Sequence, residues 1–249
     1  MRDLLRASEK EILQALFGDA QTYLHAFGFM EDAALGFRLD GWAIQCFLGL
    51  PREQLGLTAT GKPGDIDVLL LPMFDGDRFP ERAMANEAKR FMVPRARRGR
   101  SPDGFGTDQV AGLVKDGFPL VGLLHIALVE PSLNSELVEL PVLKQSYRTG
   151  ENPFDGTLRH DPANHAVTKR HEGRMRKMDL PVWVGYCVQT LSTSRDGSTF
   201  TGWSVGSCRP PSKNPHRCLA LLDRLRGLDR KPNFTVRHAG PETSISMSA

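Results

Sequence analysis

The sequence GDIDVLLL at residues 64–71, followed by NEAKRF at residues 86–91, is the stretch from which the fold is predicted. The first run contains strand-compatible isoleucine and valine, and it is too short for most helices. The connection between the two runs holds the turn signal Asp75-Gly76-Asp77. We therefore expect two short strands that pair with each other as a hairpin.

Charged side chains recur at alternate positions in both predicted strands. Side chains of a strand alternate between its two faces, so Asp65 shares a face with Asp67, and Glu87 shares a face with Lys89. Pairing of the strands would bring two acids and one amine together. Carboxylates form a hard oxygen site that suits Mg²⁺ or Mn²⁺, and a nearby lysine can stabilise charge that develops on phosphorane oxygens. The pattern therefore indicates a metal site suited to attack on a phosphoryl group.

Asp67 followed by Glu87-Ala88-Lys89 resembles the PD-(D/E)xK motif of the restriction-endonuclease-like nuclease superfamily. The resemblance implies that Asp67, Glu87 and the main-chain carbonyl of Ala88 bind Mg²⁺ or Mn²⁺. It also implies that Lys89 is the catalytic lysine. The motif lies in the expected setting, because apolar segments surround both halves of it.

Two further residues enter the site through the same resemblance. The lead-in Gly64-Asp65-Ile66-Asp67 is similar to the Gly-x-x-Asp form found in several branches of the superfamily. The literal Pro-Asp pair is absent, so Asp67 is the favoured ligand and Asp65 is kept as a supporting residue or a ligand of a second metal. Gln109 is similar in placement to a glutamine that positions substrate or water in some branches, although a polar helix-start residue would look the same.

An opening helix can also bring an acid to such a site. Some members of the superfamily place an acidic residue of their first helix near the metal, and Glu9, Glu11 and Glu31 are eligible here. Ser8 followed three residues later by Glu11 is a capping-box signature. We therefore interpret Glu11 as a cap of the helix.

The order of the predicted elements indicates an α/β fold. The resemblance implies a restriction-endonuclease-like mixed sheet flanked by helices, with a C-terminal β-hairpin and helix. Besides the two strands of the motif, we expect a helix at 8–27, a strand or buried helix at 42–50, a helix within 105–117, a buried strand at 120–129, strands at 181–192 and 199–205, and a helix at 214–227.

A run of positive charge follows the motif directly. From Lys89 to Arg100 there is no acidic residue. Arginines with glycine and proline do not pack as a core, so we expect an exposed loop. Beside a metal site, such a loop would contact a DNA backbone, with RNA not excluded and a solvated linker as the alternative reading. The candidate contact residues are Arg90, Arg95, Arg97, Arg98 and Arg100.

The 249 residues fit a single nuclease domain. Its parts would be a core at about 8–130, an irregular insertion at 130–180, a C-terminal extension at 181–228 and a disordered tail at 229–249. The insertion is expected to be irregular because it is rich in proline, glycine and polar residues. The tail is expected to be poorly ordered because it is terminal and polar.

Composition bounds the partners and the compartment. The net charge of +3 permits a nucleic-acid partner without requiring one. The four cysteines include no CxxC pair, which favours reduced thiols and a cytoplasmic location. No run is long enough to span a bilayer, so no membrane partner is expected.

Taken together, the sequence predicts a Mg²⁺-dependent nuclease that cuts DNA, as an endonuclease or an exonuclease, with a homo-oligomer left open. By analogy with the superfamily, restriction or antiviral defence in a bacterium or phage is the expected setting. Two alternatives stay open. One is a catalytically inert nucleic-acid-binding module, and the other is a protein-interaction subunit on the same fold.

Overall fold

A computed structural model describes most of the chain, namely residues 4–18, 42–58, 64–98, 106–143, 154–194, 196–197, 200–206, 208–237 and 247–248. Within these ranges the helices are η1 (Leu4–Arg6), α1 (Glu9–Gly18), η2 (Arg52–Leu55), η3 (Pro80–Arg82), η4 (Arg95–Arg97), α3 (Thr107–Asp116), η5 (Asn134–Glu136), α4 (Ala163–Met175) and α5 (Leu219–Arg226). The strands are β1 (Trp42–Leu50), β2 (Ile66–Phe74), β3 (Asp77–Arg78), β4 (Met84–Val93), β5 (Leu120–Val129), β6 (Val138–Leu143), β7 (Phe154–His160), β8 (Gly185–Thr193), β9 (Phe200–Val205), β10 (Phe234–Arg237) and β11 (Met247–Ser248).

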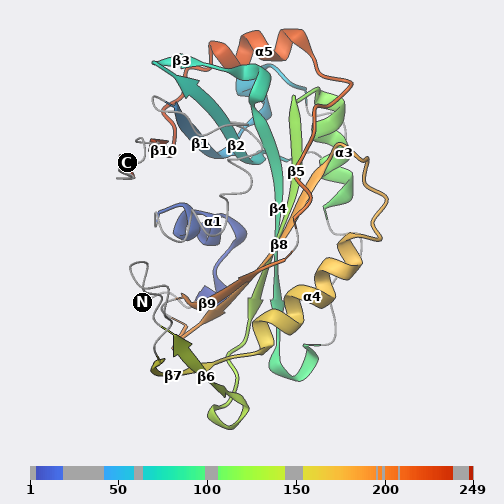
Figure 1. Ribbon diagram of the computed structural model, residues 1–249. Coiled ribbons are helices and arrows are strands. Elements are labelled where there is room, and N and C mark those ends of the chain that lie inside the picture. Colours follow the sequence, from blue (N-terminus) through green and yellow to red (C-terminus); the bar gives the residue numbers. More distant parts are fainter. Residues whose placement is uncertain are drawn as a thin grey trace.

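One mixed sheet organises the molecule (Figure 1). Its strand order is β11-β10-β1-β2-β4-β5-β8-β9, with β3 on β2, and a second sheet contains only β6 and β7. β4, β5 and β8 run parallel, while the remaining pairs of the main sheet are antiparallel. This arrangement confirms the predicted α/β class with a mixed sheet flanked by helices.

The two strands of the motif pair as predicted. β2 and β4 are antiparallel, and Val68 lies opposite Asn86 in their register. β4 then pairs in parallel with β5 along its whole length. Every residue of β5 is buried, as expected for a central strand that is covered on both faces.

The helices cover both faces of the sheet. In Figure 1, α1 lies on one side of β4, and α3 and α4 lie on the other side. Ile12 and Leu16 of α1 pack in one apolar cluster with inward residues of β1, β2, β4 and β5. Val110 of α3 and Leu225 of α5 belong to a second cluster, and Val167 of α4 belongs to a third. The apolar stripes of the helices thus meet alternate residues of the strands.

The C-terminal half follows the expected order at first. β8 and β9 form the predicted antiparallel hairpin, and α5 follows it. The range 42–50, left open between strand and helix, is the strand β1. The first helix ends within its described part at Gly18, and residues 19–27 of the predicted helix lie outside the described ranges.

Two expectations for the C-terminal half are wrong. The range 130–180 was expected to be irregular, but its described parts, 130–143 and 154–180, contain the β6–β7 ribbon and α4. A strand on the edge of a small ribbon tolerates proline, and Pro162 directly precedes α4, so the prolines do not exclude these elements. The tail expected from residue 229 contains β10, which pairs with β1 and buries Val236. Its four residues are too few to give a clear pattern in the sequence.

The expectation of reduced thiols is also wrong for two of the cysteines. Cys187 of β8 forms a disulfide with Cys208. The pairing follows from the local backbone, because Tyr186 and Arg209 form an antiparallel bridge that brings the two segments together. Among the described residues, Cys46 and Cys218 take part in no disulfide. In the described part of the chain, no helix combines the length and the apolar character that a membrane crossing requires.

Candidate active site

The site lies where β2 and β4 separate. The described ladder between the two strands stops at Val68 and Asn86. Beyond this point, the Ala88 N–H donates to Oδ2 of Asp67 at 2.8 Å, and the Arg90 N–H donates to Oε2 of Glu9 at 2.8 Å. Two carboxylates therefore satisfy successive N–H groups on the same edge of β4, where the neighbouring strand no longer does so.

Lys89 lies between these carboxylates. Its Nζ is 2.5 Å from Oε1 of Glu87, 3.7 Å from Oε1 of Glu9 and 3.9 Å from Oδ2 of Asp67. The Lys89 side chain is 14% exposed and that of Glu87 is 5% exposed. The structure thus brings together three of the residues expected from the sequence and adds Glu9 from α1. We refer to Glu9, Asp67, Glu87 and Lys89 as the acid–lysine cluster.

Glu9 and Glu11 are separated by their different roles at the start of α1. The Ser8 N–H donates to Oε2 of Glu11 at 2.8 Å, so Glu11 is the helix cap, as predicted. Glu9 instead reaches across to β4, 81 residues away in the sequence. Its eligibility was visible in the sequence, but its choice depends on how α1 docks on the sheet.

The first turn of α3 closes one side of the cluster. Gly106 precedes this helix with φ of 89°, a conformation that glycine adopts without strain. A Cβ atom at Gly106 would lie 3.0 Å from Cγ of Lys89 and 2.9 Å from Cδ1 of Leu123. Gln109 stands in the same turn and is half-buried. The helix start therefore approaches Lys89 closely at Gly106.

Burial and mutual repulsion keep the acids of the cluster easy to protonate. The pKa of Asp67 is raised to about 7, first by burial and then by the charge of Glu87, against the opposing effects of the Ala88 N–H and Lys89. Burial is also the largest cause of the raised pKa of Glu87 and of Glu9. Burial alone would lower the pKa of Lys89, but its hydrogen bond to Glu87 and the nearby carboxylate charges raise it.

The cluster has a deficit of positive charge. Three carboxylates face one ammonium group, so full ionisation would leave two uncompensated negative charges in a partly buried place. A proton on one acid or a divalent cation can relieve this repulsion, and the raised pKa values reflect the first of these. The charge balance therefore suits a hard divalent ion.

The donor atoms also suit such an ion in their chemistry. Asp67 and Glu87 offer carboxylate oxygens, and the carbonyl of Ala88 points to the same edge of β4 as its N–H, toward Asp67. Oxygen ligands of this kind are those that Mg²⁺ and Mn²⁺ prefer. Within the described ranges, no set of three His, Cys, Asp or Glu side chains is arranged to hold a metal ion as it stands. Lys89 lies against Glu87, and its ammonium group neutralises that carboxylate.

Asp65 is placed apart from the cluster. It stands at a bend before β2 and is exposed. Its charge acts on the buried Arg52, whose pKa is lowered by burial against the opposing charges of Glu87, Asp65 and Asp67. The structure therefore separates the two aspartates and brings only Asp67 to Lys89.

Arg52 is a supporting residue that the sequence reasoning missed. Its Nε donates to the Gly64 carbonyl at 2.8 Å, and its guanidinium forms an ion pair with Asp116 at the end of α3. The side chain thus ties the lead-in of β2 to the helix on the other side of the cluster. No signal marked this role, because residues 51–64 have the composition of a loop.

The structure corrects the expected role of Arg90. It was expected in an exposed basic loop, but β4 continues to Val93, so Arg90 lies within the strand. Its half-buried side chain donates to the Leu5 carbonyl. Arg90 therefore helps to hold η1 against the sheet and does not extend from a loop as a contact for DNA.

The remaining arginines follow β4. Arg95 and Arg97 are exposed in η4, as expected for the basic loop. Arg98 is half-buried and donates to the Glu130 carbonyl at 3.0 Å, so part of its donor capacity is used within the protein. Arg100 lies outside the described residues.

The fold and the site define an α/β protein with a mixed sheet and an acid–lysine cluster at the edge of a separating strand pair. A scan of the chain against protein-family models, a search of curated proteins and a search of solved structures each gave no match. The function is therefore argued from the chemistry of the cluster.

Proposed function

We propose that this protein is a Mg²⁺- or Mn²⁺-dependent nuclease that hydrolyses phosphodiester bonds in DNA. The observation that carries the proposal is the convergence of Asp67, Glu87 and Glu9 on Lys89 where β2 and β4 separate. This arrangement agrees with the restriction-endonuclease-like resemblance of the sequence motif. Two strands of a buried sheet hold the acids rigidly, as a catalytic site requires.

In the proposed mechanism, Asp67, Glu87 and the Ala88 carbonyl hold the divalent ion. When bound, the ion would supply polarisation of the scissile phosphate and charge neutralisation. The ion would also replace Lys89 as the counter-charge of Glu87. The Lys89 ammonium could then donate to a phosphate oxygen and stabilise the charge that develops there.

Glu9 is suited to handle the proton of the attacking water. It is the most exposed acid of the cluster, at 29%, and burial raises its pKa. One of its oxygens is fixed by the Arg90 N–H, which leaves Oε1 near Lys89 to accept a proton. Gln109, in the first turn of α3, is proposed to orient the substrate or this water, on the resemblance of its position to that of a glutamine in some branches of the superfamily.

Cleavage of plasmid, linear and single-stranded DNA and of RNA tests the proposal. The wild-type chain should cut DNA with Mg²⁺ or Mn²⁺ and lose this activity in EDTA. Lys89→Met should reduce the rate by about 10²-fold or more, since removal of one transition-state donor costs on that order. Lys10→Met, an exposed lysine next to Glu9 in α1, is the matched control and should cut at the wild-type rate. Equal rates for the two variants would refute the assigned role of Lys89.

One observation favours a second candidate, a catalytically inert nucleic-acid-binding module. The described residues hold no ready-made group of three metal-binding side chains, and Lys89 neutralises Glu87 directly. Such a module would bind DNA equally well with Mg²⁺ and with EDTA and would leave it intact. Calorimetric titration with Mg²⁺ separates the two candidates, since the nuclease requires a metal site that Asp67→Asn weakens.

A further inference from the structure

A basic surface lies outside the acid–lysine cluster. It is formed by η4 and by the outward side of α4 with the turn that follows this helix. Its members are exposed, and no acid is exposed within either helix. We define the basic surface as Arg95, Arg97, Lys169, Arg170 and Lys177.

A main-chain contact joins the two halves of this surface. The Arg170 guanidinium donates to the carbonyl of Arg98, 72 residues earlier in the chain. Arg98 in turn donates to the Glu130 carbonyl at the end of β5. Figure 1 shows α4 beside the lower part of the sheet, close to the loop that follows β4. These contacts hold η4 and α4 in one position relative to each other, so their positive charges belong to one surface.

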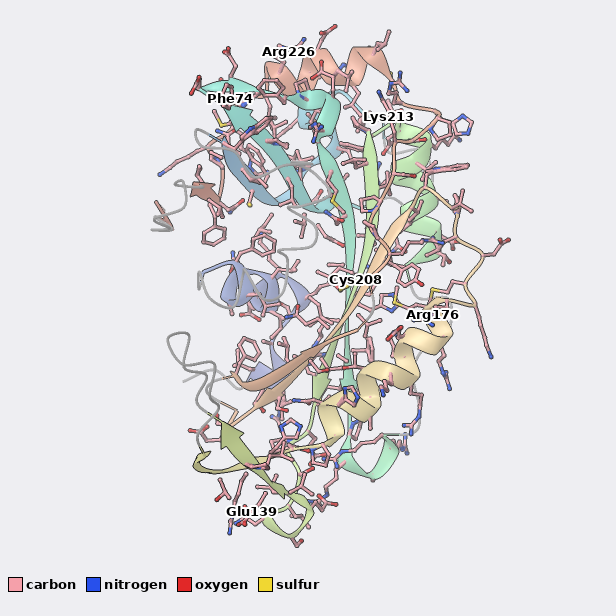
Figure 2. All side chains as sticks on the ribbon, viewed as in Figure 1. Phe74, Glu139, Arg176, Cys208, Lys213 and Arg226 are labelled. Atoms are coloured by element: carbon pink, nitrogen blue, oxygen red, sulfur yellow. A yellow bond between two sulfur atoms is a disulfide. The ribbon has the colours of Figure 1, made fainter. Side chains whose placement is uncertain are left out.

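Arg176 differs from its neighbours. Figure 2 shows it at the C-terminal end of α4, where it pairs with Glu172 one turn earlier. Its charge is thus compensated within the protein, and it is not counted in the basic surface. Arg170 also uses one donor on Arg98, but its side chain remains exposed.

Gly173 lies in the last turn of α4, between Lys169 of the helix and Lys177 of the turn that follows it. Gly173 is one turn after Lys169, so these two residues share one side of the helix. Glycine inside a helix costs about 1 kcal/mol relative to alanine. A Cβ atom at Gly173 would meet nothing within 4 Å, so packing within the protein does not explain the glycine. A bare helix surface between two lysines allows a ligand backbone to approach closely.

The chemistry of the surface favours the backbone of a duplex over a single strand. Proteins that hold single strands stack the bases on aromatic side chains. Neither η4 nor α4 contains Phe, Tyr or Trp, and no Phe, Tyr or Trp side chain with a described environment is exposed. Charge without stacking partners suits phosphate contacts along a duplex.

The position of the surface fits the flank of a substrate bound at the cluster. Val93 is four residues beyond Lys89 on β4, which is about 13 Å at the usual rise of a strand. That distance corresponds to about four base pairs of duplex DNA. α4 has 13 residues and extends for about 20 Å, the length of about six base pairs. It runs back beside the sheet toward the level of the cluster, because Val167 packs with Val93, whereas His171 bonds to His125, the register partner of Lys89.

We propose that the basic surface of η4 and α4 binds the phosphate backbone of duplex DNA on one flank of the cleaved bond. The inference rests on the proposed function, because the scissile phosphate at the cluster sets the position of the duplex. The contacts are independent of base sequence and sensitive to salt.

Binding of a labelled 30-base-pair DNA duplex by fluorescence anisotropy, in EDTA so that no cleavage occurs, tests the surface. Lys169→Gln with Lys177→Gln removes two charges from it. The matched control, Lys213→Gln with Lys231→Gln, removes two charges from exposed positions elsewhere. Figure 2 places Lys213 in a different region from Arg176 and α4. The first double variant should bind about tenfold more weakly and lower the slope of log K against log salt by about two, because each lysine–phosphate contact contributes about one unit.

A second test keeps every lysine. Gly173→Glu adds a negative charge between Lys169 and Lys177 with a residue that favours helices, so it should weaken duplex binding. The control, Gly173→Gln, has a similar size and no charge, and it should weaken binding less. If the two double-lysine variants show equal affinity and equal salt slope, the proposed DNA-binding role of the surface is refuted, whereas the nuclease proposal is unaffected. Equally strong binding of a 30-nucleotide single strand would overturn the choice of a duplex. Absence of cleavage in Mg²⁺ would refute only the nuclease proposal, because binding is measured without metal.

Discussion

The carboxylate of Asp67 accepts the main-chain N–H of Ala88 at 2.8 Å, on the edge of β4 from which β2 departs. Asp67 therefore has two roles, as an acceptor for a strand N–H and as a proposed metal ligand. The two roles respond differently to substitution. Loss of the acceptor leaves a main-chain N–H without its partner, whereas loss of the charge alone affects the site.

Asp67→Asn and Asp67→Ala should separate the two roles. Asparagine can still accept the Ala88 N–H, so its stability should stay close to that of the wild type while cleavage falls below one hundredth of the wild-type rate. Alanine should abolish cleavage and also cost about 1–3 kcal/mol of unfolding free energy. Chemical denaturation and cleavage assays measure the two effects.

Asp65→Asn is the matched control, because it makes the same change at an exposed position two residues earlier. It should retain cleavage within about threefold, as surface substitutions usually have small effects. A loss of activity in Asp65→Asn as large as that in Asp67→Asn would transfer the ligand role to Asp65.

The raised pKa of Asp67 predicts an unusual dependence of stability on pH. Because the folded-state pKa is about 7 against an ordinary value of 3.8, the folded protein holds a proton that the unfolded chain has released in this range. This contribution to stability is complete below about pH 4 and is lost as the pH rises to about 7 and above. In EDTA, the melting temperature of the wild type should therefore fall between pH 5 and 8 relative to that of Asp67→Asn.

Mg²⁺ should reverse this loss, because the ion stabilises the ionised carboxylates. Calorimetry at pH 8 should show a higher melting temperature with Mg²⁺ for the wild type. The increase should be about 4 °C for each tenfold rise in Mg²⁺ concentration above the dissociation constant of the site. Asp67→Asn should show a much smaller increase. A melting temperature that does not depend on Mg²⁺ at any pH would argue against a metal site in the cluster.

Cleavage should depend on pH in the same range. Asp67 must lose its proton to bind a metal, so at limiting Mg²⁺ the rate should rise with pH through about 7. Saturating Mg²⁺ competes with the proton and should move the midpoint to lower pH. Rates measured from pH 5 to 9 at two Mg²⁺ concentrations test this shift. A midpoint that is the same at both concentrations would contradict the assignment of Asp67 as a metal ligand.

Glu9 and Glu11 offer a paired test of the opening helix. Glu9→Gln keeps an acceptor for the Arg90 N–H but removes a charge that raises the pKa of Glu87. It should lower the cleavage rate by about 10²-fold, as expected for loss of a general base, and move the pH profile to lower pH. Glu11→Ala removes the cap and should cost about 1 kcal/mol of stability with little change in rate. If Glu11→Ala lowered the rate and Glu9→Gln changed only the stability, then Glu11 would be the acid of the site and Glu9 the cap.

The local pattern of the motif predicted the central part of the site well. The alternation of side chains along a strand was sufficient to place Glu87 and Lys89 on one face. β2 and β4 pair as expected, but the turn at Asp75–Gly76 joins β2 to the short strand β3, and η3 then leads to β4. These inferences need only neighbouring residues. The likeness of the motif to a nuclease site stays a hypothesis.

Parts of the site that depend on tertiary packing could not be predicted. Glu9 reaches Arg90 only because the apolar stripe of α1 docks on the sheet at one place. Arg52 is buried where its side chain pairs with Asp116 at the end of α3, and Arg90 is part of β4 because the strand pairs with β5 as far as Val93. In each case a long-range contact decided the role of a charged residue whose own neighbours suggested a loop.

Gly106 and Gly173 are the last pair of positions to compare, because alanine should act in opposite directions at the two. At Gly106, φ of 89° is unfavourable for alanine, and the new Cβ would lie 3.0 Å from Cγ of Lys89 and 2.9 Å from Cδ1 of Leu123. At Gly173, in the last turn of α4, an added Cβ meets nothing within 4 Å. Gly106→Ala should therefore destabilise the protein by about 1–3 kcal/mol, and Gly173→Ala should stabilise it by up to about 1 kcal/mol.

The cleavage rates of the same two variants show whether the start of α3 positions Lys89. Under conditions in which both variants are fully folded, Gly106→Ala should still cut more slowly by about tenfold or more, because displacement of a catalytic group by a fraction of an ångström is costly. Gly173→Ala should cut a short duplex at the wild-type rate. If Gly106→Ala is destabilised but cuts as fast as the wild type, then Gly106 serves only the fold, and the close approach of α3 to Lys89 has no part in the chemistry.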